Sequence, residues 1–241
     1  MYRKLLRKLS LCLLIIFTLE DAEMEALHFD PSALPLRMRG LPISDNGWIV
    51  PWFVAWVNDQ PEFRAMDAGK WREAVRHKLC WVCGQQLGAY LAFVLGPMCA
   101  INRTIAEPPS HRQCAEWSIK NCPFLSRPQM RRRENDLPED ITGGAGVAIR
   151  RNPGAVLLWI AKDYRVFKDP AGMPLIQVGD ATELSWWCQG RAATREEVQA
   201  SVESGLPLLE DIARPDGADA LAELQRRKAE VEKLYPAEVS V

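Results

Sequence analysis

The chain has 241 residues, of which 48% are hydrophobic and 25% are charged, and its formal net charge is −1. This balance is typical of a soluble globular protein with enough apolar residues for a sizeable core. It argues against a globally basic nucleic-acid-binding protein, because no overall positive field would attract phosphates. Seven cysteines are an odd number and suggest no regular disulfide framework.

Residues 1–23 combine a basic start with an apolar run over 9–19. Such a run is typical of a signal peptide and is too short for a stable membrane span. The segment after it, LEDAEMEA, is acidic and lacks a small-x-small cleavage site. We therefore interpret 1–23 as a dispensable leader or as a start assigned too early, with Met24 as the true start. On this interpretation the protein is cytoplasmic, and export through a true signal peptide is the alternative.

Residues 24–79 are expected to form an N-terminal unit. The segment 24–47 is rich in proline, glycine and polar residues, which predicts an irregular lead-in. Aromatic and β-branched residues then fill 52–57, and a second short strand is predicted over 62–66. The NDQP turn between the two strands makes this region a β-hairpin.

A short amphipathic helix is predicted directly after this hairpin. Asp67 is a favourable N-cap, and Trp71, Val75 and Leu79 follow at a spacing of four residues. This helix leads the chain into Cys80.

Two close pairs of metal-binding residue types follow. In CWVCG, Cys80 and Cys83 lie on a tight turn, and Gly84 permits a backbone conformation that a side chain would oppose. In SHRQC, His111 and Cys114 are three residues apart, which places both on one face of a helix. A zinc ion takes four such ligands at the corners of a tetrahedron. The sequence therefore predicts a zinc site, with a helix N-terminus that favours the thiolate of Cys114.

The predicted elements between and after the two pairs support this site. Two apolar runs over 90–105, divided at Gly96, predict a second β-hairpin. Ser110 is then a favourable N-cap for a helix that stops near Cys122. We expect 80–126 to form one zinc-binding unit.

A knuckle, a hairpin and a helix with two ligands in its first turn form an order that resembles the treble-clef zinc finger. The resemblance covers residues 80–122 and implies a structural zinc ion held by Cys80, Cys83, His111 and Cys114. More loosely, the whole chain resembles an uncharacterised group of bacterial and prophage proteins, which implies no particular activity.

Other interpretations of the cysteines stay open. A CxxC pair can be a redox couple, although such a pair usually opens a helix after a strand. The cysteines can instead form a disulfide in an exported protein, or lie buried as small apolar groups. Cys99 can replace His111 as a ligand, but we favour a buried apolar role for Cys99, Cys122 and Cys188. His77 is interpreted as a surface residue.

Residues 127–145 are rich in proline, glycine and mixed charge and predict a linker. Residues 146–241 are expected to form a β-rich segment with a helical tail. The apolar runs 146–154, 155–168 and 174–180 are separated by turn sequences and predict strands.

The helical tail has a clear start. Thr194 and Glu197 have the spacing of a capping box. Gly205 and Pro207 are expected to break this first helix, and residues 220–235 predict a terminal amphipathic helix. The whole chain is therefore predicted to have an α+β fold.

The predicted function follows from the zinc site. Four protein ligands close a zinc site and make it structural, so we predict a non-enzymatic protein that binds nucleic acid or another protein. No motif for a small-molecule cofactor is present. The treble clef also hosts His-Asn-His nucleases, but these need a general-base histidine that the 90–105 region lacks.

Basic residues that can contact a phosphate backbone are Arg112, Lys120, Arg131, Arg132 and Arg133. The alternative for the arginine run is a solvated linker whose charge is offset by neighbouring acids.

Overall fold

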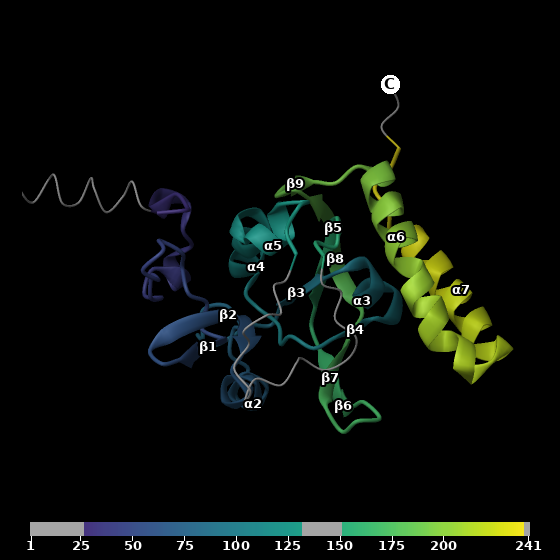
Figure 1. Cartoon of the computed structure of the whole chain (residues 1–241), viewed down its shortest axis with the longest axis horizontal. Helices are drawn as coiled ribbons and strands as arrows, with labels where there is room; N and C mark the ends of the chain where they lie inside the picture. The colour runs from purple at the N-terminus through teal and green to yellow at the C-terminus, as the bar shows by residue number, and fades with distance from the viewer. Residues whose placement is uncertain (1–26, 132–150, 239–241) are drawn as a thin grey trace, which may run out of the picture.

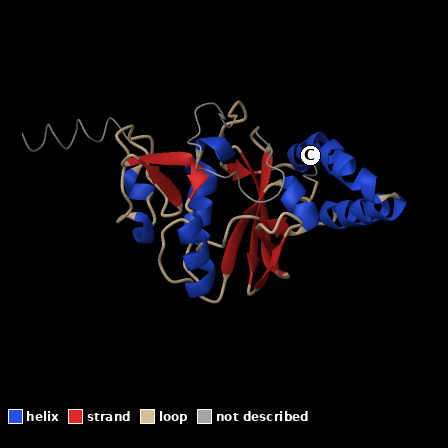
Figure 2. Ribbon diagram, turned by 60° about the horizontal axis from the view of Figure 1, so that its bottom comes forward, coloured by secondary structure: helices blue, strands red, loops and turns tan. Residues whose placement is uncertain are grey.

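The computed structural model describes residues 27–131 and 151–238. In these residues the strands form three antiparallel sheets, which helices flank on both sides (Figures 1 and 2). The predicted α+β fold is confirmed. The leader 1–23, together with Arg132 and Arg133, lies outside the described residues.

The predicted N-terminal hairpin and helix are confirmed. Two short 3-10 turns, Pro31–Ala33 and Leu36–Met38, precede them. Strand β1 (Val54–Val57) pairs with β2 (Gln60–Met66). Helix α2 (Ala68–His77) then begins where the carboxylate of the preceding Asp67 accepts hydrogen bonds from two backbone N–H groups of the first turn.

A four-stranded sheet forms the centre of the molecule, in the order β3-β5-β8-β9. Its strands are β3 (Leu91–Leu95), β5 (Ala155–Ala161), β8 (Ala181–Cys188) and β9 (Arg191–Ala192). All seven residues of β5 are buried because both faces of the sheet are covered. Val156, Leu158 and Ile160 pack in one apolar cluster, and Leu157 and Trp159 belong to the other, larger one.

The predicted second hairpin over 90–105 is wrong. Residues Pro97–Asn102 form a helix, α3, which Gly96 caps and which carries proline in its first turn, where the missing N–H costs nothing. Strand β3 before this helix pairs with β5, and the short β4 (Thr104–Ile105) after it pairs with β7. The two apolar runs therefore enter different sheets.

The second sheet has three strands in the order β4-β7-β6. Strands β6 (Tyr164–Lys168) and β7 (Pro174–Val178) form its hairpin. Together with β5 and β8, they confirm that this part of the chain is rich in strands. The predicted strand over 146–154 is not found in its described part, residues 151–154, and 146–150 lie outside the described residues.

The predicted helix after Pro109 is present, but it begins one residue later than expected. Its N-cap is His111 and not Ser110, and α4 runs over Arg112–Asn121. The carbonyl of Ser110 accepts a hydrogen bond from the N–H of Ala92 at 2.9 Å, and the N–H of Ser110 donates to the carbonyl of Ala92 at 2.8 Å. The first helical hydrogen bond is therefore accepted by the carbonyl of His111, from the N–H of Ala115 at 2.9 Å. A short helix, α5 (Pro123–Ser126), follows.

The helical tail consists of α6 (Arg195–Ala213), a 3-10 turn at Arg214–Asp216, and α7 (Ala218–Glu232). These helices lie beside each other, on the side of the central sheet away from the β1-β2 hairpin (Figure 1). The Thr194 capping box is confirmed. The predicted break at Gly205 and Pro207 is wrong, because α6 continues through both residues. Gly205 permits close packing, since a Cβ there would lie 3.0 Å from the Met98 side chain in α3 and would require that side chain to shift.

Among the described residues, none of the helices has the length and apolar character that crossing a membrane requires.

Candidate metal centre

Four side chains converge from two separate parts of the chain, the turn that follows α2 and the start of α4. The sulfur atoms of Cys80, Cys83 and Cys114 and a ring nitrogen of His111 all lie within 4.8 Å of one another. The three cysteines are buried and His111 is partly buried. This is the residue set that the sequence spacing predicts, and its composition can hold a metal ion.

The first pair is positioned by a tight turn. The N–H of Cys80 donates to the carbonyl of Gln85 at 2.7 Å, and the N–H of Gly84 donates to the carbonyl of Cys80 at 2.8 Å. Gly84 has a φ of +71°, which residues with a side chain rarely adopt. A Cβ at this position would also lie 2.7 Å from the ring of Trp52. The turn therefore depends on glycine, as its sequence position suggests.

Backbone hydrogen bonds bring the second pair to this turn. The N–H of Trp81, between the two cysteines, donates to the carbonyl of Pro109 at 3.0 Å. Ser110, the residue after Pro109, is fixed by its backbone bridge with Ala92 in β3. Helix α4 therefore begins beside the turn, with His111 as its N-cap and Cys114 in its first turn.

Backbone donors point at the sulfur of Cys80. The N–H of Cys83 lies 3.4 Å from it and the N–H of His111 lies 3.3 Å from it. Such donors stabilise negative charge on the sulfur. Cys80 is thus prepared to act as a thiolate, the form of cysteine that binds metals.

The distances around His111 fit a tetrahedral ion. Its Nδ1 lies 3.4 Å from the sulfur of Cys83 and 4.0 Å from that of Cys114. Nitrogen and sulfur ligands on a common tetrahedral zinc are ~3.5 Å apart, given their usual bond lengths. The two separations bracket this value.

The other ring nitrogen of His111 has a partner that sets the tautomer. Nε2 lies 2.9 Å from the backbone carbonyl of Gln86. A carbonyl only accepts hydrogen bonds, so Nε2 carries the proton. Nδ1 of the neutral ring then presents its lone pair to the sulfurs. Metal-binding histidines usually have such an outer hydrogen bond, which fixes the ring.

The four groups titrate together. Burial raises the pKa of Cys80, but hydrogen bonds with Cys114, Cys83 and His111 outweigh it and lower that pKa below its ordinary value. The hydrogen bond with Cys80 raises the pKa of Cys114, and that of His111 as well. These hydrogen bonds favour negative charge on the sulfur of Cys80. A divalent cation would displace the remaining thiol protons, because cysteine binds metals as the thiolate.

The remaining cysteines lie outside this cluster. Cys99 lies in α3, where burial raises the pKa of its thiol to about 12. Cys188 is buried and Cys122 partly so. Cys99 and Cys188 are free thiols.

The basic residues expected to contact nucleic acid differ in how their side chains are already engaged. Arg112 forms ion pairs with Glu116, at 2.8 Å, and with Glu183. Lys120 lies 5.4 Å from the ring centre of Trp187. Arg131 is exposed, and its backbone forms an isolated antiparallel β-bridge with that of Arg151.

Two contributors to the site could not be identified from the sequence. Gln86 acts through its backbone carbonyl, which every residue type has, so residue identity carries no signal. Trp52 covers the turn at Gly84, and only its place in an aromatic strand pattern suggests a buried role. Comparison of the chain with protein families, curated proteins and solved structures gives no significant match.

Proposed function

We propose that Cys80, Cys83, His111 and Cys114 bind one structural zinc ion, and that the protein is a non-enzymatic binding protein. The observation that carries the proposal is the convergence of four ligand atoms within 4.8 Å, with Nδ1 of His111 turned toward the sulfurs. Three soft sulfur ligands and one imidazole are a common donor set for structural zinc.

The ion would have a structural role for two reasons. Four protein ligands fill a tetrahedral zinc and leave no position for a reacting water. The ion would also join the end of α2 to the start of α4, elements about 30 residues apart along the chain, so its binding free energy would add to folding stability. The proposed site has the knuckle and the ligand helix of a treble clef. It lacks the hairpin between them, because β3 and β4 enter different sheets.

Nucleic acid is one proposed partner, and Arg131 and Arg151 support it. They lie opposite each other, and within the described ranges neither forms an ion pair with a carboxylate. Like charges in this arrangement repel, and a phosphate between them would relieve the repulsion. Lys120 is a further candidate contact, whereas Arg112 would first have to leave its two carboxylates.

A protein partner is the second candidate, and the β1-β2 hairpin supports it. Trp56 is 46% exposed and Phe63 is 45% exposed. Both residues lie in this hairpin, where Trp56 of β1 pairs with Pro61 of β2 and Phe63 follows in β2. Exposed aromatic residues of this kind are enriched in protein interfaces. A reducing compartment such as the cytoplasm suits either role, because the ligand thiolates must stay reduced.

The nucleic-acid proposal is tested with fluorescently labelled single- and double-stranded DNA and RNA in magnesium-free buffer without chelator. We expect binding that weakens with salt, and an Arg131→Gln, Arg151→Gln variant whose log–log salt slope is smaller by about 1 to 2. Arg72→Gln, an exposed change on α2, is the matched control. Equal binding by all three proteins would reject this face and favour a protein partner. Cleavage that begins only when magnesium is added would support the nuclease alternative.

A further inference from the structure

A cleft of about 420 Å³ lies between α3, the two larger sheets and α7, and the metal centre contributes none of its lining. Its apolar lining includes Ile101, Trp159, Val231 and Leu234. Its charged lining includes Arg103 and Arg227. The volume is within the range of small-molecule sites in proteins, and a largely apolar lining with a few polar groups is typical of them.

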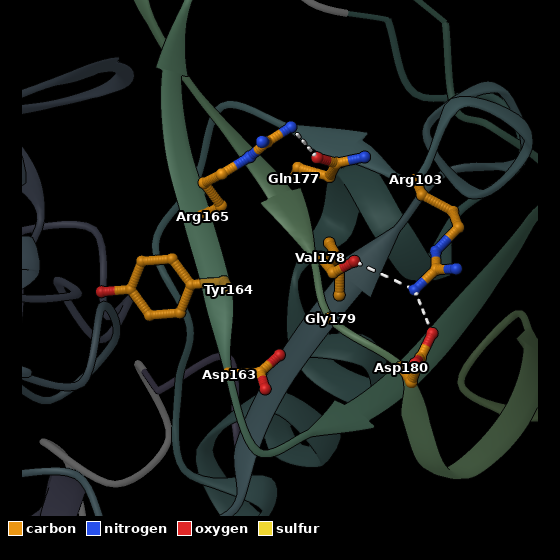
Figure 3. A pocket seen from close by; sticks show the side chains of 8 residues that line it. All are labelled: Arg103, Asp163, Tyr164, Arg165, Gln177, Val178, Gly179 and Asp180. Carbon is orange, nitrogen blue, oxygen red and sulfur yellow. Dashed lines mark hydrogen bonds and ion pairs between the residues drawn. The ribbon is translucent and has the colours of Figure 1, made fainter.

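Arg103 is held in place before any ligand arrives. Its guanidinium lies 5.3 Å from the ring centre of Trp159. One nitrogen, Nη2, donates to the carbonyl of Val178 at 3.2 Å and to the carboxylate of Asp180 at 2.8 Å (Figure 3). Its backbone has a φ of +51°, which is unusual for a residue with a side chain. The guanidinium is therefore pre-organised by stacking and by a backbone acceptor.

The hydrogen bonds of Arg103 are incomplete. Both acceptors bind Nη2, while Nε is buried and has no acceptor. A buried donor without a partner is rare in native proteins and calls for an explanation. A guanidinium with spare donors at the edge of an apolar cleft is suited to an oxygen anion.

The charges of the cleft favour an anion over a cation. Arg227 donates to Glu223 at 2.7 Å, but Glu223 also accepts from Arg226, so one carboxylate serves two guanidinium groups. Glu230, the acidic residue of the lining, is paired with Lys233 at 2.7 Å. Asp180 lies outside this cleft, and its side chain is 97% exposed. By its lining residues alone, two arginines and one glutamate, the cleft therefore has an excess of positive charge, of which Asp180 offsets a part at Arg103.

A second hollow, of about 360 Å³, shares Arg103 with the cleft but has different chemistry (Figure 3). Its lining includes two arginines, Arg103 and Arg165, and two aspartates, Asp163 and Asp180. These charges balance, and Arg165 already donates to Gln177 at 2.6 Å. This hollow lacks both the surplus charge and the apolar wall, and it supplies a control position.

We propose that the cleft beside α7 binds a small organic carboxylate with an apolar body. The carboxylate would be bound by Arg103 and Arg227, and the apolar body would lie against Trp159, Val231 and Leu234. This inference does not depend on the metal centre or on the macromolecular partner.

The proposal is tested on the full chain by isothermal titration calorimetry with octanoate and 4-phenylbutyrate. The neutral 4-phenylbutyramide is the matched probe. We expect the carboxylates to bind, and the amide to bind at least about tenfold more weakly, since a charge-assisted hydrogen bond is lost. Arg103→Asn keeps a residue that tolerates the left-handed backbone and should weaken binding of the carboxylates by about tenfold or more.

Two further variants separate the cleft from its surroundings. Val231→Trp should fill the cleft and abolish binding, while Arg165→Gln, in the neighbouring hollow, should leave the affinity unchanged. Circular dichroism and thermal unfolding establish that each variant is folded before it is compared. The proposal is overturned if neither carboxylate binds at millimolar concentration. It is also overturned if the amide binds as tightly as the acid, or if Arg103→Asn binds like the wild type.

Discussion

Nε2 of His111 lies 2.9 Å from the backbone carbonyl of Gln86, and this contact turns the other ring nitrogen toward three cysteine sulfurs. The acceptor belongs to the turn that carries Cys80 and Cys83, whereas the histidine belongs to the start of α4. The hydrogen bond thus aligns one ligand pair with the other. Because the acceptor is a main-chain group, a change in the side chain of Gln86 leaves it in place, although that side chain also donates to the carbonyls of His77 and Lys78.

The first prediction follows from this backbone contact. His111→Ala should lower zinc affinity by at least ~10-fold, because loss of an outer-shell partner alone typically costs 10- to 100-fold and this change removes the ligand itself. Gln86→Ala removes only the side chain and should retain an affinity close to that of the wild type. A competition titration with a chromophoric zinc chelator measures both. If the two substitutions weaken binding equally, His111 is not a ligand through Nδ1.

The second prediction concerns the glycine of the turn. Gly84→Ala should destabilise the protein by about 1–3 kcal/mol, because it combines a positive φ with a Cβ 2.7 Å from the ring of Trp52. Gly88→Ala is the control, since a Cβ there meets nothing within 4 Å. Urea unfolding measures the free energy of both variants. Equal stability of the two would mean that Trp52 does not cover the turn.

The third prediction concerns the pH dependence of the α6 capping box. The hydrogen bond with Arg191, followed by that with the N–H of Thr194, lowers the pKa of Glu197 to about 2. The unfolded value is about 4.3, so the folded form binds its proton less readily. The stabilising effect is then fully present above pH ~4.3 and is lost as the pH falls toward 2.

Glu197→Gln tests this dependence. Glutamine can keep the hydrogen bond to the N–H of Thr194 but loses the ion pair with Arg191. The variant should therefore be less stable than the wild type by roughly 0.2–1 kcal/mol near neutral pH, the usual size of a solvent-exposed ion pair. The difference should stay constant from pH 8 to 5 and shrink below pH ~4.3. Chemical unfolding at several pH values measures it, and both proteins experience the same loss of any bound metal in acid. A difference that grows as the pH falls would contradict the assigned pKa direction.

The candidate metal centre was predictable because its signal is local. Each ligand pair lies within four residues, and a tight turn or the first turn of a helix brings such a pair to one side by its own geometry. The capping residues Asp67 and Thr194 were predictable for the same reason, since a cap acts within one helical turn.

The pairing of the central strands was not predictable, because their partners are distant in the chain, unlike those of the β1-β2 hairpin. Local turn signals favour a hairpin between β3 and its nearest neighbour, but β5 offers β3 five paired residues. Strand β5 is buried on both faces, and only pairing on both edges satisfies its backbone. Local turn signals such as Gly96-Pro97 indicate where a strand ends and not where the next one pairs.

Tertiary packing also overrode local helix signals. Gly205 and Pro207 each weaken an isolated helix, yet α6 continues through both. The packing of Gly205 against Met98 of α3 stabilises the helix at a point where the local sequence disfavours it. Ser110 is a better N-cap than His111 by residue type, but its carbonyl is already bound by the N–H of Ala92 and so does not accept the first helical hydrogen bond. The one-residue difference makes His111 the cap, which places its ring next to the cysteines.

The proposed zinc ion, held by the four side chains, would support the fold. Elemental analysis of the full chain purified from cells tests for it, beside a Cys83→Ser, Cys114→Ser variant, with Cys99→Ser as a control outside the cluster. We predict one zinc per chain in the wild type and in the control. In the double variant we predict loss of the metal, together with a large fall in stability. A folded wild-type protein without metal, or a double variant that retains zinc, would contradict this account.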